Sequence, residues 1–135
     1  TSTANMDPVL IVGAGIVGLT LGQALKKVVM PQTLKLPNDK LQRQIPFEIY
    51  ERDLTADARG QGWAITLHWA LEYLEQMLPE DALSRVQSVQ VDPDVAKHDN
   101  GNFLFINLET GDPKFKIPPN RRWRVNREKM RRALV

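Results

Sequence analysis

A glycine pattern that directly follows a short apolar run constrains this chain more than any other feature. Residues 9–12, Val-Leu-Ile-Val, have the apolar and β-branched composition of a strand in a parallel sheet. They lead into Gly13-Ala-Gly-Ile-Val-Gly18, and the residues beyond follow helical spacing to about Met30, before Pro31. The order of strand, glycine turn and helix predicts the first half of a βαβ unit.

Each glycine of this turn has a physical task. Gly13 permits a tight turn out of the strand, and Gly15 lets the backbone approach a diphosphate. Gly18, with Gly22 four residues later, lets the helix pack close to the sheet. The free N–H groups and the positive dipole end of the helix favour an anion at the turn. The turn, with Ala14, is therefore a candidate site for the diphosphate of a dinucleotide.

An acid follows the second predicted strand, Phe47–Tyr50, whose residues alternate in polarity. Glu51 at its end can accept hydrogen bonds from both ribose hydroxyls of an adenosine, and it repels a 2′-phosphate, which disfavours NADP. It lies 33 residues after Gly18, whereas the usual interval is about 20. We assign the excess to a surface insertion over residues 31–46, since a surface loop lengthens at little free-energy cost. These residues leave both FAD and NAD open as ligands.

The remainder of the chain predicts a loop, three helices and a hairpin. The loop covers Asp53–Gly62, an amphipathic helix covers Leu67–Leu78 and ends at Pro79, and a short helix covers Glu80–Val86. Two strands, at Phe103–Leu108 and Phe115–Ile117, flank a turn at residues 109–113. Asn126 caps a last helix, whose apolar members are Met130, Ala133 and Leu134. The chain ends within that helix without a stop signal, so we expect a truncated protein.

Composition excludes several classes of function. The chain has no cysteine, which rules out disulfides and thiolate chemistry and suits the cytoplasm. His68 and His98 have no partner at metal-ligand spacing, so we expect no metal. No apolar stretch approaches the roughly 20 residues of a membrane span. Residues 1–7 lack the pattern of a signal peptide, and we expect them to be disordered.

The basic residues concentrate near the C-terminus. From Lys114 onward, nine side chains are basic and one is acidic. Such a tail can meet cofactor phosphates, a nucleic acid or an acidic surface of its own fold. Nucleic acid is disfavoured because only Trp123 interleaves an aromatic ring with this charge. Four of the arginines are expected to be solvated: Arg121, Arg122, Arg131 and Arg132. The three tryptophans are expected to be packing residues: Trp63, Trp69 and Trp123.

The chain resembles the FAD-dependent aromatic hydroxylases, a family of single-component flavoprotein monooxygenases that includes enzymes like salicylate hydroxylase and para-hydroxybenzoate hydroxylase. Three stretches carry the resemblance, in the order of the family and over nearly the whole chain: Val9–Leu25 with Tyr50-Glu-Arg-Asp53, then Arg59-Gly-Gln-Gly62 leading into the next helix, then Arg124-Val-Asn-Arg127-Glu-Lys-Met130. Many flavoproteins share the first stretch, whereas the other two are more particular to this group.

The resemblance implies an FAD site built from the glycine turn and four charged residues. The turn residues would contact the FAD diphosphate: Gly13, Ala14, Gly15 and Gly18. Glu51 would bind the adenosine ribose, and Arg52 would lie near the adenine. Arg59 matches an arginine that reaches the FAD phosphates or ribityl chain, and Arg127 matches a further FAD contact. A guanidinium suits these places because its fork matches phosphate oxygens.

The implied fold is α/β, with a Rossmann-like FAD-binding βαβ unit, additional helices and a β-hairpin, incomplete relative to the family. The family's later Gly-Asp motif, its Asp-Gly stretch and its substrate-covering sheet have no counterpart here. We therefore interpret residues 1–135 as the N-terminal part of an FAD-binding domain, with the substrate domain absent. No residue present qualifies as a catalytic acid or base.

The parent protein would be an FAD-dependent monooxygenase. It would use NAD(P)H and O2 to hydroxylate or epoxidise a small organic, often aromatic, substrate, with the oxygen chemistry supplied by the cofactor. The isolated chain is expected to be inactive. Two alternatives stay open: a non-catalytic, truncated nucleotide-binding module, and a fragment of an NAD-dependent oxidoreductase. The oligomeric state is left open.

Overall fold

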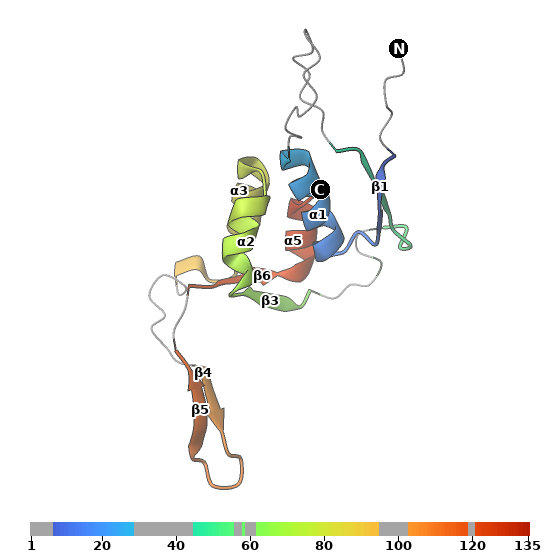
Figure 1. Ribbon diagram of the computed structural model, residues 1–135. Helices are drawn as coiled ribbons and strands as arrows, with labels where there is room; N and C mark the ends of the chain where they lie inside the picture. The colour runs from blue at the N-terminus through green and yellow to red at the C-terminus, as the bar shows by residue number, and fades with distance from the viewer. Residues whose placement is uncertain (1–6, 29–44, 56–57, 59–61, 95–102, 119–120) are drawn as a thin grey trace, which may run out of the picture.

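A computed structural model describes residues 7–28, 45–55, 58, 62–94, 103–118 and 121–135, which combine helices and short sheets in a mixed α/β arrangement. In chain order its elements are β1 (Val9–Val12), α1 (Ile16–Lys27), β2 (Phe47–Tyr50), β3 (Ala64–Leu67), α2 (Ala70–Met77), α3 (Glu80–Ser88), β4 (Phe103–Ile106), β5 (Pro113–Ile117), β6 (Trp123–Asn126) and α5 (Arg127–Ala133). Figure 1 shows the helices gathered together, with β1 and β2 along one side and β3 and β6 beneath them.

The first three elements form the predicted βαβ unit. Strands β1 and β2 pair in parallel, with Val9 opposite Phe47 and Val12 opposite Tyr50. Helix α1 joins the two strands and packs on them. It ends at Lys27, earlier than the expected Met30, because Val28 already has an extended backbone. The insertion predicted over residues 31–46 and the disorder expected for residues 1–7 fall almost wholly outside the described residues.

The antiparallel pair of β3 and β6 was not predicted. Ile65 lies opposite Val125, and Leu67 opposite Trp123. The helix predicted over Leu67–Leu78 begins only at Ala70, so its first turn was wrong. The apolar spacing misled because Leu67, the last residue of β3, is buried in the same core as the helical leucines. In β6, buried positions alternate with exposed or partly exposed ones, which is the pattern of a half-buried strand.

One apolar core lies between the helices and the β3–β6 pair. Its fully buried members come from α2, α3, β6, α5 and the residues that end them, and the largest are Leu71, Leu78, Val86, Val125, Met130 and Leu134. Helix α3 confirms the predicted short helix and extends it to Ser88. The cap of α5 is also confirmed, because Asn126 Oδ1 accepts a hydrogen bond of 2.9 Å from the Lys129 N–H.

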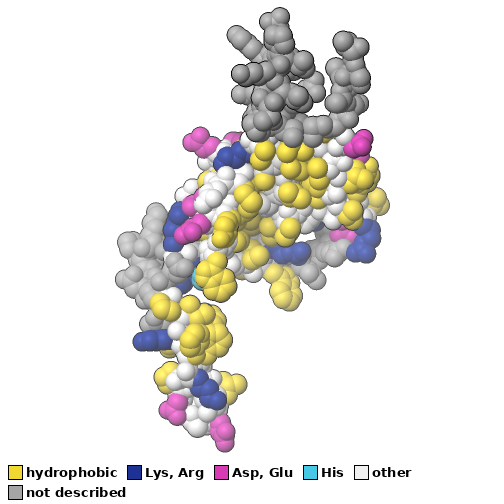
Figure 2. Space-filling model, in the orientation of Figure 1, with side chains coloured by type: hydrophobic (Ala, Val, Ile, Leu, Met, Phe, Trp, Pro, Cys, Tyr) yellow, Lys and Arg dark blue, Asp and Glu magenta, His cyan; other side chains and the backbone are white. Residues whose placement is uncertain are grey.

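The predicted hairpin is confirmed as β4 and β5, and Figure 1 shows it extending away from the helices. Every residue of β4 is exposed, and the ring of Phe105 lies against the rings of Phe103 and Phe115. Figure 2 shows hydrophobic side chains on the surface of the hairpin. None of the described helices is long and apolar enough to cross a bilayer.

The tryptophans do not all pack as expected. Trp123 is 7% exposed and belongs to the core, as predicted. Trp63 and Trp69 are 70% and 78% exposed, so the expectation was wrong for these two. Trp63 precedes β3, and Trp69 occupies the N-cap position of α2.

Candidate functional site

The glycine turn connects the end of β1 to the first turn of α1. Gly13 has a φ of +103°, a conformation that favours glycine. Its N–H donates to the Tyr50 carbonyl oxygen at 2.7 Å, which ties the turn to the end of β2. Gly15 occupies the N-cap position of α1, where no side chain caps the helix and the first turn has no acid. The N–H groups of this first turn are therefore available to an anion.

The turn has two sides that differ in the space around them. On what we call the open side, a Cβ added to Gly13 or Gly15 would meet nothing within 4 Å. On the packed side, a Cβ at Gly18 would lie 2.0 Å from the Gly13 carbonyl oxygen, and one at Gly22 would lie 3.1 Å from Ile49 Cδ1. The packed side thus holds α1 against β1 and β2, while the open side leaves room for a ligand.

Glu51 reaches the turn from the end of β2. Its Oε2 accepts a hydrogen bond of 2.7 Å from the Ala14 N–H, and its Oε1 accepts one of 3.0 Å from the Asp53 N–H. These bonds, first the one from Asp53 and then the one from Ala14, hold the pKa of the Glu51 carboxyl below its ordinary value. Oε1, which accepts only the Asp53 N–H among the described residues, can accept a further hydrogen bond. The arrangement places a charged acceptor beside the glycine turn.

Arg131 of α5 also reaches the turn, so the expectation that its side chain is solvated was wrong. Its Nε donates to the Ala14 carbonyl oxygen at 2.7 Å, and its Nη2 lies 3.4 Å from Glu51 Oε2. Its side chain is only 22% exposed. The one signal in the sequence is its position beside Met130 and one turn before Leu134, at the border of the buried face of α5. What lies across that border depends on tertiary packing.

Of the three arginines predicted for the cofactor site, the two that the structure describes do not reach the glycine turn. Arg52 is largely exposed, with its Nε 3.9 Å from Asp53 Oδ1. Arg127 is exposed at the start of α5, and its backbone N–H donates to the Trp63 carbonyl oxygen at 2.8 Å. It lies four residues before Arg131, on the same side of the helix. Arg59 lies outside the described residues. The structure thus brings Glu51 to the turn and leaves Arg52 and Arg127 facing solvent.

Several charges of the basic tail pair with acids of the chain itself. Both terminal nitrogens of Arg121 donate to the Glu75 carboxylate, which raises the pKa of Arg121. Arg132 pairs with Glu128 one turn earlier on α5, at 2.6 Å. Together with the pair of Arg131 and Glu51, these contacts are instances of one of the three possibilities that the sequence left open, in which the tail meets acidic groups of its own fold.

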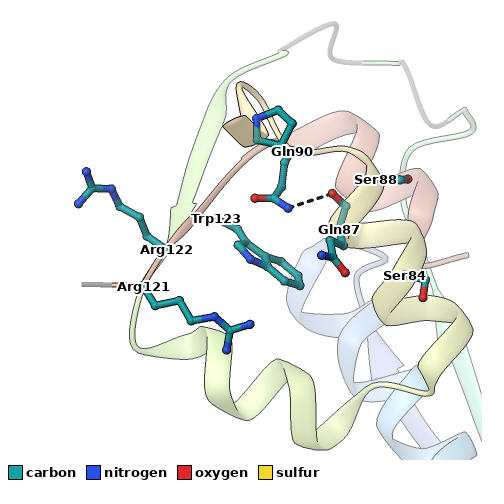
Figure 3. A pocket seen from close by; sticks show the side chains of 8 residues that line it. Ser84, Gln87, Ser88, Gln90, Arg121, Arg122 and Trp123 are labelled. Carbon is teal, nitrogen blue, oxygen red and sulfur yellow. Dashed lines mark hydrogen bonds between the residues drawn. The ribbon is translucent and has the colours of Figure 1, made fainter. Parts of the chain in front are cut away.

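A separate hollow of about 550 Å³ lies beside the C-terminal half of α3. Figure 3 shows Gln87, Gln90 and Trp123 around it, with Arg121 and Arg122 at one side. The Gln90 amide donates to the Gln87 carbonyl oxygen at 3.2 Å. No lining residue comes from β1, α1 or β2, so this hollow is distinct from the glycine turn.

Comparison with known proteins identifies the family. No family model matches the chain. It is 47% identical over 128 residues to the FAD-dependent monooxygenase dbaB of Emericella nidulans, covering 94% of this chain and 28% of that protein. It is 44% identical over 135 residues to a probable FAD-dependent monooxygenase of Arthroderma benhamiae, covering 99% of this chain and 28% of that one. The chain belongs to the FAD-dependent monooxygenases.

A third relative extends the agreement. The FAD-dependent monooxygenase tazP of Aspergillus terreus is 39% identical over 114 residues, which cover 82% of this chain and 27% of that protein. The chain therefore spans somewhat over a quarter of the length of these curated FAD-dependent monooxygenases. The family expected from the three sequence stretches is thereby confirmed, with FAD as its cofactor.

Proposed function

We propose that the open side of the glycine turn binds the diphosphate of FAD and that Glu51 binds the adenosine ribose, in a Rossmann-like unit made of β1, α1 and β2. One observation carries this proposal. The Glu51 carboxylate accepts the Ala14 N–H beside an uncapped helix N-terminus, so an acceptor for hydroxyls and donors for phosphates stand next to each other. That combination suits a ribose linked to a diphosphate.

The residues present fit the adenosine diphosphate half of FAD. At Gly15 the missing Cβ leaves space for phosphate oxygens, and the helix dipole of α1 is uncompensated by an acid in its first turn. At Glu51 the lowered pKa keeps the carboxylate an acceptor at neutral pH. We assign Arg52 to the neighbourhood of the adenine, and Arg59 and Arg127 to further contacts with the cofactor.

The whole protein is proposed to be a flavin-dependent monooxygenase that takes electrons from NAD(P)H and uses O2 to hydroxylate or epoxidise a small organic, often aromatic, substrate. FAD supplies the oxygen-activating chemistry when bound. The part played by this chain is to bind and orient the adenosine end, and we assign no catalytic residue to it. A chain without cysteine suits a cytoplasmic enzyme.

Two alternatives make different predictions for the cofactor. An NAD-dependent oxidoreductase would use the same glycine turn and Glu51 but would bind NAD and carry no flavin. A non-catalytic nucleotide-binding module would bind adenosine nucleotides regardless of the flavin half. The similarity to FAD-dependent monooxygenases favours FAD over both alternatives.

The test is FAD binding by the Gly15→Val variant. The valine side chain would fill the open side without touching protein atoms at its Cβ, so we expect the fold to persist and flavin binding to be lost. Bound flavin is measured by equilibrium dialysis and by the visible absorption of the purified chain. The control is Ser84→Val, which places the same β-branched side chain on α3 beside the hollow of Figure 3.

The two variants separate the candidate sites. Loss of flavin in Gly15→Val with retention in Ser84→Val supports the glycine turn. Retention of flavin in Gly15→Val contradicts the proposed site, and loss only in Ser84→Val would move the cofactor to the hollow. Preference of the wild-type chain for NAD over FAD would favour the dehydrogenase alternative.

A further inference from the structure

We infer that Arg131 is a positioning residue of the nucleotide site, which holds the Ala14–Gly15 peptide and the Glu51 carboxylate in the arrangement that an adenosine diphosphate requires. The inference rests on the proposed function and adds to it a residue from the far end of the chain. It assigns Arg131 no contact with the cofactor, because its described partners are groups of the protein.

Three groups close a ring of hydrogen bonds around Ala14. The Arg131 Nε donates to the Ala14 carbonyl oxygen at 2.7 Å, and Glu51 Oε2 accepts the Ala14 N–H at 2.7 Å. The ring closes between Arg131 Nη2 and the same Glu51 oxygen, at 3.4 Å. Both polar backbone groups of Ala14 are thus held by charged side chains, and such bonds are stronger than those between neutral groups.

The ring sets the direction of the next N–H group. No peptide bond among the described residues is cis, and in a trans peptide the N–H points opposite to the carbonyl. Because the Ala14 carbonyl points to Arg131, the Gly15 N–H points away from that guanidinium. Gly15 itself faces open space. The donor is therefore oriented before any ligand arrives, which reduces the ordering that binding requires.

The guanidinium is well fixed for this role. Its helix is anchored by Met130, Ala133 and Leu134 in the core. The Leu134 carbonyl oxygen also accepts a hydrogen bond of 2.7 Å from the Gln23 side-chain amide of α1. The side chains of Arg131 and Glu51 are 22% and 24% exposed. A lysine would keep the charge, but its single ammonium lacks the planar fork that reaches two partners at defined angles.

The chain offers a matched control one residue away. Arg132 lies on the same helix and pairs with Glu128, and its side chain is 58% exposed. Replacing either arginine with glutamine removes one positive charge from the same turn of α5. Only the replacement of Arg131 opens the ring around Ala14. A difference between the two variants therefore reports on position and not on net charge.

The experiment compares Arg131→Gln, Arg131→Lys and Arg132→Gln in the full chain, with ADP as the probe and calorimetry as the measurement. We expect ADP affinity to fall about tenfold in Arg131→Gln and to change less than about twofold in Arg132→Gln, since a charge-assisted hydrogen bond is at stake in the first only. In ligand-free protein, the Gly15 amide resonance should shift in Arg131→Gln and stay in place in Arg132→Gln.

A coupling test separates positioning from an independent contribution. If Arg131 acts through Glu51, the double variant Arg131→Gln with Glu51→Gln should lose less affinity than the product of the two single losses. Thermal unfolding of each variant tests whether the fold persists. If Arg131→Gln unfolds, ADP affinity is compared in Arg131→Lys, which keeps the charge beside Glu51.

The outcomes distinguish this inference from the proposal on which it rests. Equal ADP affinity in Arg131→Gln and Arg132→Gln, or full affinity in Arg131→Lys, would overturn the positioning role while the glycine-turn site stands. Strictly multiplicative losses in the double variant would also overturn it. If the wild-type chain binds neither ADP nor FAD, the proposed function itself fails and the inference falls with it.

Discussion

The packed and open sides of the glycine turn differ in what each glycine faces, although the four glycines lie within ten residues of one another. Gly18 and Gly22 face the protein: a Cβ at Gly18 would meet the Gly13 backbone and the Ile11 side chain of β1, and one at Gly22 would meet side chains of β2. Gly13 and Gly15 face empty space. A glycine at which an added Cβ would collide is required by the packing of the fold. A glycine at which an added Cβ would meet nothing is required either by its backbone conformation, as at Gly13, or by a ligand.

The largest effect is expected on the packed side. In Gly18→Ala the new Cβ would lie 2.0 Å from the Gly13 carbonyl oxygen and 3.2 Å from Ile11 Cγ2, so the backbone must move. We expect the free energy of unfolding to fall by about 3 kcal/mol or more, the upper range for an overpacked site. Urea unfolding followed by circular dichroism measures this change.

The control for that variant is Gly15→Ala on the open side. Gly15 has an ordinary backbone conformation and an added methyl group meets nothing, so the loss of stability should stay within about 1 kcal/mol, the range of N-cap substitutions. Equal destabilisation of the two alanine variants would erase the distinction between the two sides.

A smaller effect is expected beside the open side, at Glu51. Glu51→Ala removes the acceptor for the Ala14 N–H and for the ribose. The free energy of FAD binding should therefore weaken by about 1–3 kcal/mol, the usual range for polar groups that lose a charged partner. The control is Glu48→Ala, which removes the same charge from β2, where the Tyr50 hydroxyl donates to it. Fluorescence titration with FAD measures both, and equal affinities would exclude Glu51 as the ribose acceptor.

The sequence predicts this region well because its signals are local. The strand, the turn, the helix and Glu51 follow one another along a βαβ unit, and the glycine spacing encodes both the close packing and the open space. Helix boundaries were less accurate at Lys27 and Ala70, where backbone geometry decides and apolar spacing does not.

The missed features depend on contacts between distant segments. The pairing of β3 with β6 joins residues some sixty positions apart, and Arg131 meets Ala14 across 117 positions. A four-residue strand such as Trp123–Asn126 has too few residues for its alternation to stand out. An arginine at the border of a buried helix face could meet solvent, an acid or a carbonyl, and only the packing of α5 against α1 decides among them.

The central claim is that the open side of the glycine turn holds the FAD diphosphate. The most direct measurement is an amide chemical-shift map of the isotope-labelled chain as FAD is added. The account predicts that the largest shifts occur at the N–H groups of Gly15, Ile16 and Val17 and that the Glu51 carboxyl resonance moves with them. Shifts confined to residues around the hollow of Figure 3, such as Gln87 and Trp123, with the turn unchanged, would contradict it.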